Sequence, residues 1–134
     1  MISDIKIPEV KNVTLAVARK KNIGESDEWK VYLINSNDFA IENTLVASKG
    51  YGEKDGEPQR TSVLRHFLDT IPSNSATLIE PIDAGVFHLN NEYWVSYYVG
   101  AQIFDKRFVF VPDSIREENI SFIKELEMEG ILHS

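Results

Sequence analysis

Three glycines in the stretch SKGYGEKDGEPQRTSVLRHF (48–67) raise the question of a phosphate-binding loop. Gly50, Gly52 and Gly56 follow the spacing G-x-G-x-x-x-G, one residue away from the dinucleotide-binding fingerprint, and no Gly-Lys-Ser/Thr follows as a phosphate loop requires. A phosphate cradle also needs the aligned N–H groups of a helix N-terminus, whereas RTSVLRHF continues as a predicted strand. We therefore predict no phosphate site and no cofactor.

Side chains capable of acid-base chemistry are present but not grouped. His66 stands among leucines, where a histidine is more often a structural core residue than a catalyst. No spacing typical of a metal site or of a serine nucleophile occurs, so we assign no catalytic or metal-binding residue. If the chain is a small enzyme or a small-ligand binder, we expect its polar site to use His66, Arg65, Asp69, Asp83 and His88.

Aromatic residues mark a candidate interface. In the predicted strand EYWVSYYV (92–99), tyrosines and valines alternate on one face, and the other face carries Trp94 and Tyr98. A single core buries only one face of a strand, so the end of the chain, a partner protein or a second copy must cover the other. Because Trp, Tyr and Arg anchor protein interfaces, we take Trp94, Tyr98, Tyr51 and Arg60 as candidate interface residues.

Size and charge exclude several classes of protein. The chain has 134 residues, of which 43% are hydrophobic and 26% charged, as is typical of one folded domain. Its formal net charge of -7 repels a phosphate backbone, so we expect no nucleic-acid partner. The start, MISDIKIPEV, lacks a basic segment before an apolar run, and no apolar stretch approaches the ~20 residues of a membrane helix, so we expect no secretory signal, no membrane contact and a cytoplasmic location. The absence of cysteine excludes disulfides and thiol catalysis.

Short strands separated by turn residues account for most of the chain. Apolar and polar residues alternate in segments rich in β-branched and aromatic side chains, and clusters of Gly, Asn, Asp and Ser lie between them. The predicted strands cover 12–20, 28–35, 41–49, 76–82 and 103–111, with VFHL (86–89) and EYWVSYYV (92–99) in addition.

Two hairpins are predicted from turn residues. Asp55-Gly56 suits a two-residue type I′ turn, which would place Tyr51 opposite Arg60 and Leu45 opposite His66. Facing residues share a side of the sheet, so Leu45 and His66 would lie together on the more apolar face. A bulge at Gly50 or Gly52 would shift the pairing by one residue and exchange the two faces. Asn90-Asn91 predicts a second tight hairpin, between VFHL and EYWVSYYV.

The last segment, 113–134, carries mixed signals. Ser114 and Glu117 have the spacing of a capping box, which predicts a short helical turn. In KELEMEGIL, apolar and acidic residues alternate with period two, and Gly130 would interrupt a helix. We therefore expect the tail to end as an edge strand.

Together these patterns predict one domain, 1–134, with an all-β fold. We expect an immunoglobulin-like antiparallel sandwich of about seven or eight strands, in which Tyr93 is a candidate tyrosine corner, with a closed β-barrel as the alternative. The favoured function is a non-enzymatic protein-binding or assembly module, whose partner is another protein or a second copy. The small enzyme or ligand binder stays open as the alternative.

Several segments resemble those of a small family of bacterial cytosolic proteins: YLIN, ASKGYG, TSVLRHFL, LNNEYWVSYYV, RFVFVPDSI and GIL. The resemblance covers most of the chain, from about Ile5 onward. Some members of that family carry the label phenylalanyl-tRNA synthetase alpha subunit, which implies a third function, an accessory protein of an aminoacyl-tRNA synthetase system. The resemblance brings no established catalytic residues with it, and the chain lacks the large antiparallel catalytic domain that a class II synthetase needs.

Overall fold

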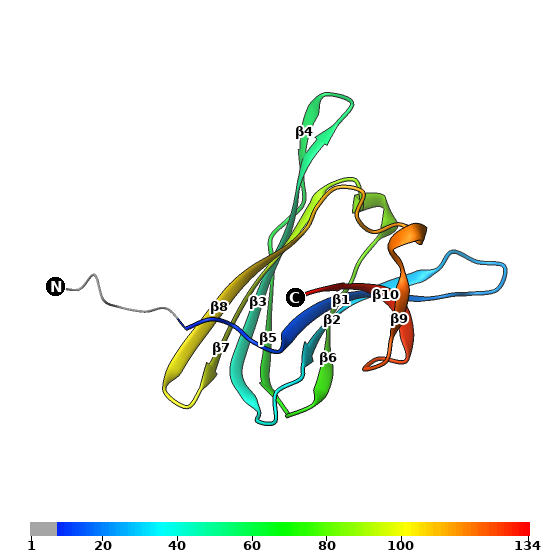
Figure 1. Ribbon diagram of the computed structural model, residues 1–134. Coiled ribbons are helices and arrows are strands. Elements are labelled where there is room, and N and C mark those ends of the chain that lie inside the picture. Colours follow the sequence, from blue (N-terminus) through cyan, green and yellow to red (C-terminus); the bar gives the residue numbers. More distant parts are fainter. Residues whose placement is uncertain (1–7) are drawn as a thin grey trace.

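The computed structural model describes residues 8–134, which form two antiparallel sheets packed as a sandwich (Figure 1). Each sheet has five strands, and within these residues neither closes into a barrel, so the barrel alternative is wrong. The expected lack of a secretory signal and the start of the resemblance at Ile5 involve residues 1–7, which lie outside the described part. The elements are β1 (Val13–Lys20), β2 (Glu28–Asn35), β3 (Ile41–Lys54), β4 (Glu57–Arg60), β5 (Leu64–Ile71), β6 (Ser75–Pro81), η2 (Ala84–Val86), β7 (Asn90–Val99), β8 (Gln102–Phe110), η3 (Glu117–Asn119), β9 (Ser121–Ile123) and β10 (Met128–His133).

The two sheets enclose one main core. Sheet A has the strand order β6-β2-β1-β10-β9, and sheet B has the order β4-β3-β7-β8, with β5 also paired to β3. The predicted alternation is confirmed in both sheets: Leu15 faces Leu33 in sheet A, Tyr93 faces Phe108 in sheet B, and all four are buried. Burying a side chain of this size contributes roughly 1.5–3 kcal/mol, so the packing of these inner faces holds the sandwich together.

The hairpin at Asp55-Gly56 forms as predicted near its tip but not beyond it. Both residues have positive φ, and Tyr51 pairs with Arg60. Figure 1 shows this hairpin as an arm that extends beyond the sandwich. Farther from the turn the pairing moves by one residue, so that His66 faces Val46 instead of the predicted Leu45.

The shift comes from an extra residue on the returning strand and not from a glycine bulge. Thr61 still bonds to Gly50, through Thr61 N–H to the Gly50 carbonyl and Gly50 N–H to Thr61 Oγ1, whereas the next paired residue, Leu64, faces Ser48. Residues 61–63, which lie between β4 and β5 and belong to neither strand, absorb the difference. Because side chains alternate, this single step places His66 opposite the inward-facing Val46 and separates it from Leu45, which faces outward.

The predicted hairpin at Asn90-Asn91 is wrong. Both residues lie inside β7, and VFHL contains the end of the short helix η2 instead of a strand. The Asn90 amide donates to the Tyr51 carbonyl, and the Asn91 amide donates to the Val86 and Leu89 carbonyls. These bonds satisfy the two polar side chains within the sheet, where the sequence pattern favoured a turn.

The end of the chain joins sheet A. Strand β10 lies between β1 and β9, so it is one strand in from the edge at which we expected it. Ser114 does not cap η3: its hydroxyl donates to the Val111 carbonyl, and η3 begins after Arg116. Gly130 has a specific role, because a Cβ there would lie 2.3 Å from the Val17 carbonyl oxygen. No helix in residues 8–134 is long and apolar enough to cross a membrane.

Candidate functional site

A buried carboxylate, Glu80, lies between the two sheets near one open side of the sandwich. It belongs to β6, where Val31 pairs with Glu80 and Tyr32 pairs with Leu78, so that Ile79 is an extra residue in a β-bulge. As a result Ile79 and Glu80 are both buried, although neighbours on a regular strand point to opposite faces. Bulges re-aim side chains in this way, and this one turns a carboxylate inward.

Three donors from sheet B surround this carboxylate. The Ser48 hydroxyl on β3 donates to Glu80 Oε1 at 2.7 Å, and His66 Nε2 on β5 lies 2.7 Å from the same oxygen. The Tyr93 hydroxyl on β7 donates to Glu80 Oε2 at 3.1 Å. A buried carboxylate is costly without such partners, so this group of four side chains both satisfies Glu80 and links β6 to sheet B.

The geometry is not that of a serine-type catalytic triad. In a triad the serine is hydrogen-bonded to the histidine, whereas here Ser48 and His66 both reach Glu80 Oε1. Burial, and next the charge of Glu80, raise the pKa of Tyr93 well above its usual value, so its hydroxyl stays protonated and donates. Tyr93 therefore bonds to a carboxylate in this structure, where a tyrosine corner would bond to the backbone. The arrangement is suited to holding a carboxylate in place and offers no activated nucleophile.

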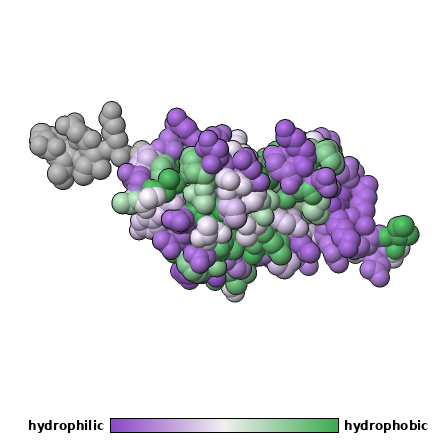
Figure 2. Space-filling model, turned by 90° about the horizontal axis from the view of Figure 1, so that it is seen from below, coloured by the Kyte–Doolittle hydropathy of each residue, from purple (hydrophilic) through white to green (hydrophobic). Residues whose placement is uncertain are grey.

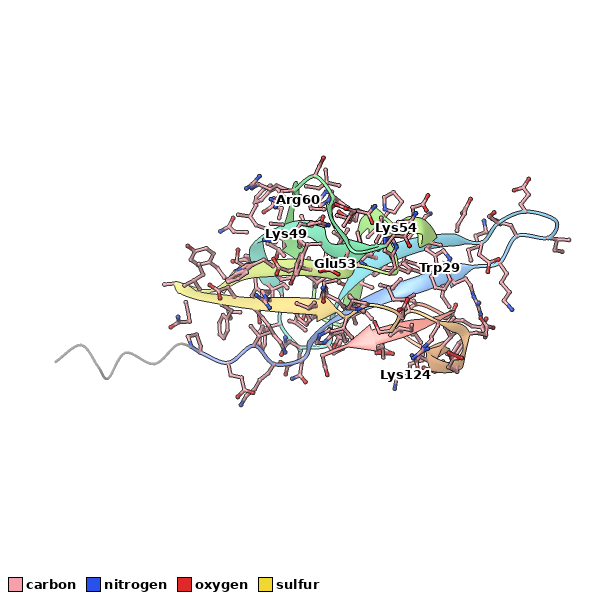
Figure 3. All side chains as sticks on the ribbon, turned by 90° about the horizontal axis from the view of Figure 1, so that it is seen from above. Trp29, Lys49, Glu53, Lys54, Arg60 and Lys124 are labelled. Atoms are coloured by element: carbon pink, nitrogen blue, oxygen red, sulfur yellow. The ribbon has the colours of Figure 1, made fainter. Side chains whose placement is uncertain are left out.

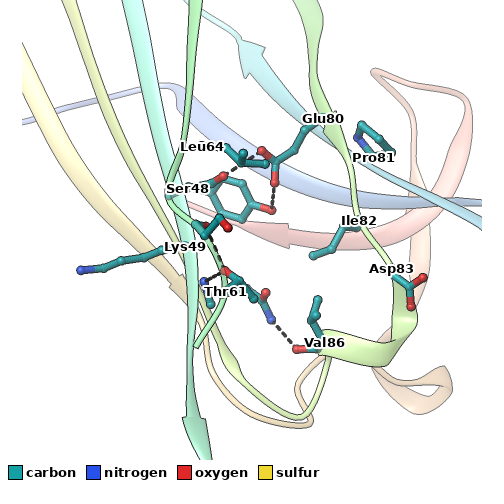
Figure 4. A pocket seen from close by; sticks show the side chains of 13 residues that line it. Ser48, Lys49, Thr61, Leu64, Glu80, Pro81, Ile82, Asp83 and Val86 are labelled. Carbon is teal, nitrogen blue, oxygen red and sulfur yellow. Dashed lines mark hydrogen bonds between the residues drawn. The ribbon is translucent and has the colours of Figure 1, made fainter. Parts of the chain in front are cut away.

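A cavity of about 360 Å³ opens beside Glu80 (Figure 4). Its apolar lining comes from Leu64, Pro81, Ile82 and Val86, and its polar lining includes Ser48, Thr61, Asn91 and Tyr93. Figure 4 shows the Lys49 side chain pointing away from the cavity. Its Nζ lies 3.7 Å from Glu92 Oε2, outside this space. The cavity thus has a buried hydrogen-bond acceptor, the Glu80 carboxylate, and apolar side chains in the same lining.

The structure does not bring the five predicted polar residues together. His66 alone reaches the Glu80 carboxylate. Asp83 lines the same cavity, but its Oδ1 accepts from Gly85 N–H and so caps η2. His88 lies against Gln59 Oε1, 2.7 Å away. Arg65 and Asp69 are exposed on β5.

Sequence reasoning missed Glu80 and Ser48. The only local signal for Glu80 is one carboxylate inside the apolar segment ATLIEPI, which we read as a strand limited by its proline. Ser48 gives no signal of its own, because the sequence pattern does not decide which face of β3 is buried.

The second candidate region is the outer face of sheet B. Trp94 and Tyr98 lie there with 46% and 37% of their surfaces exposed, while their neighbours on β7, Tyr93 and Tyr97, are buried in the core. Strands on either side add further exposed apolar side chains. We call the following set the outer patch: Leu45, Phe67, Trp94, Tyr98 and Ile103.

The register arranges this face in two adjacent rows that run across the strands β5, β3, β7 and β8. The first row ends in arginines on both sides, and the second ends in a phenylalanine and an aspartate. The first row is Arg65, Ala47, Trp94 and Arg107; the second is Phe67, Leu45, Ser96 and Asp105. On each of the two central strands, one row therefore carries a bulky residue and the other a small one: Leu45 and Ala47 on β3, and Trp94 and Ser96 on β7.

The two remaining candidate interface residues lie at one end of this face. Tyr51 faces Arg60 where the β3–β4 arm begins, and Lys49 Nζ lies 5.7 Å from the centre of the Tyr51 ring. Figure 3 shows Lys49 and Arg60 on the same side of the molecule and Lys124 on the opposite side. Tyr51 and Arg60 thus extend the outer face beyond the patch without joining its apolar centre.

No group of three His, Cys, Asp or Glu residues able to hold a metal ion occurs in residues 8–134. No protein-family model matches the chain, and neither a curated protein nor a solved structure is similar to it at a significant level. The resemblance to the bacterial family therefore stays a prediction.

Proposed function

We propose that this protein is a non-enzymatic assembly module that binds a second copy of itself through the outer face of sheet B. The observation that carries this proposal is the outer patch, in which large apolar side chains are exposed on one continuous sheet face. Exposed patches of this kind mark protein interfaces, and tryptophan and tyrosine are the residues that most often anchor them.

The two rows favour a second copy because they complement each other. When two such faces stack about a two-fold axis that runs across the strands between the rows, each row meets the other row of the second copy. Trp94 then lies opposite Ser96 of the second copy, and Leu45 opposite Ala47, so on the two central strands each bulky side chain meets a small one. At the edge of the sheet, Arg107 lies opposite Asp105 of the second copy. Aligned sheets pack within about 30° of each other, which permits this stacking.

Truncation of the central tryptophan tests the interface. We expect the wild type to sediment as a dimer at micromolar concentration and Trp94→Ala to dissociate at least about tenfold more readily, since anchors of this kind contribute ~2 kcal/mol or more. The matched control is Phe122→Ala, which removes an exposed aromatic side chain from β9 in sheet A. A monomeric wild type, or equal effects of the two substitutions, would contradict the proposal.

Charge reversal tests whether the partner on the outer face is a second copy of the same chain. Arg107→Glu and Asp105→Lys should each weaken the dimer, because each places like charges opposite one another. Mixing the two variants should restore association as a heterodimer, which native mass spectrometry separates from the homodimers by mass. If the mixture stays as dissociated as its components, the stacking is wrong.

We also propose that the sandwich is immunoglobulin-like. The order β1-β2-β6 corresponds to strands A, B and E of that fold, and β5-β3-β7-β8 corresponds to C′, C, F and G, which supports the assignment. Strands β10 and β9 extend the first sheet beyond strand A. An experimental structure with a different strand order would overturn it.

A further inference from the structure

We propose that the cavity beside Glu80 binds a small organic ammonium ion with an apolar body. This site is separate from the outer patch: Glu80, Ser48 and Tyr93 point into the sandwich, and the patch side chains point out of it. The inference therefore does not depend on the proposed assembly.

The hydrogen-bond inventory of Glu80 leaves room for one more donor. A carboxylate offers about four acceptor positions, two on each oxygen. Ser48 and His66 occupy Oε1, whereas Tyr93 alone donates to Oε2. The three protein donors hold the carboxylate in one orientation, so a ligand N–H would meet an acceptor that is already positioned.

The charges around the cavity favour a cation. Glu80 and Asp83 both line it, and the one lysine in its lining, Lys49, points away and pairs with Glu92 (Figure 4). His66, with Nε2 2.7 Å from Glu80 Oε1, is the one basic side chain within ion-pair distance of this carboxylate among residues 8–134. An ammonium group on the Glu80 side makes a charge-assisted hydrogen bond, which is stronger than one between neutral groups.

The apolar lining of the cavity determines which body the ammonium ion should carry. Leu64, Ile82 and Val86 form an apolar surface next to the carboxylate, and the volume of about 360 Å³ is at the small end of the range for ligand pockets. The matching chemistry is a primary amine attached to a compact hydrocarbon, such as an arylalkyl or a short alkyl group.

The test uses the full chain with benzylamine as the probe, and benzyl alcohol as its neutral counterpart of similar shape. Isothermal titration at neutral pH, supported by ¹⁵N amide shifts, should show benzylamine binding at least about tenfold more tightly than the alcohol. Amide shifts should concentrate on residues that line the cavity. Equal binding of the two probes, or no binding of benzylamine at millimolar concentration, would overturn the proposal.

Two variants and a control locate the site. Glu80→Gln should reduce benzylamine binding at least tenfold, while Asp69→Asn, which removes an exposed carboxylate from β5 outside the cavity lining, should leave it unchanged. Because Glu80→Gln also alters the links between the sheets, Leu64→Trp provides a second variant: it keeps the carboxylate and fills the cavity from a half-exposed position. If Leu64→Trp binds benzylamine as well as the wild type does, the ligand does not occupy this cavity.

Discussion

The two outer faces of the sandwich are both apolar, but the end of the chain packs over part of only one of them. On sheet A, Ala16 and Ile34 are buried under Ile123 from β9, with Leu126 from the following turn packed against them. On sheet B, residues 8–134 leave the outer patch exposed. The end of the chain thus covers the centre of the outer face of sheet A and leaves the outer patch of sheet B exposed.

The space-filling view shows hydrophobic surface in two places (Figure 2). Seen from below, hydrophobic surface runs through the middle of the body between hydrophilic areas, and a further hydrophobic area marks the far end of a projection (Figure 2). The loop between β1 and β2 ends there, with Ile23 fully exposed. A lone exposed residue of this kind is common, whereas the outer patch is built from four adjacent strands and is the observation on which the proposed assembly rests.

The largest effect on the covered face is expected at Gly130. Gly130→Ala should lower the free energy of unfolding by about 3 kcal/mol or more, because the new methyl group would overlap the backbone of β1 and push β10 away. Chemical denaturation would measure it. Leu132→Ala, on the same strand but half exposed, is the control and should cost less than about 1 kcal/mol. A stable Gly130→Ala protein would mean that β10 does not approach β1 this closely.

A pair of truncations compares the two faces directly. Ile123→Ala removes a buried side chain from the covering of sheet A and should cost about 2–3 kcal/mol. Phe67→Ala removes a larger side chain from the outer patch, where 62% of it is exposed, and should change the stability of the monomer by about 0.5 kcal/mol or less. Denaturation at a concentration low enough to dissociate dimers separates folding from assembly. Equal losses would show that the patch is covered.

The sequence predicted what depends on local pattern. The inward alternation of Tyr93 and the outward position of Trp94 follow from period-two patterning within a single strand, and both are confirmed. The tight turn at Asp55-Gly56 follows from residue chemistry and is confirmed as well.

The features that could not be predicted depend on strand register, which is set by the number of residues in irregular segments between paired strands. One extra residue between β4 and β5 decides whether Val46 or Leu45 faces His66, and no propensity fixes it. The bulge at Ile79 decides where Glu80 points. The partners of Glu80 come from three strands of the other sheet, so the polar group is visible only once the sheets are assembled.

The smallest expected effect concerns the ion pairs that hold the end of the chain to sheet A. The buried Arg19 side chain on β1 bonds to Glu117 in η3 at 2.5 Å and to Glu129 in β10 at 3.2 Å. The hydrogen bond to Arg19 holds the pKa of Glu117 below its usual value, against an opposing contribution from desolvation. A carboxylate with a lowered pKa stabilises the fold above its unfolded-state pKa, about 4.3, and this contribution is lost as the pH falls through the lower, folded-state value.

We therefore expect Glu117→Gln to be less stable than the wild type near neutral pH and equal to it at the acid end of the range. Thermal unfolding from pH 7 down to pH 2.5 would measure the difference. Glu118→Gln is the control, since Glu118 is also exposed but pairs only with its neighbour Arg116. A difference that persists unchanged at low pH would show that Glu117 acts through packing and not through its charge. Because the outer patch lies on the opposite sheet, assembly should not change with Glu117→Gln, which separates the contacts that cover sheet A from those proposed to pair sheet B.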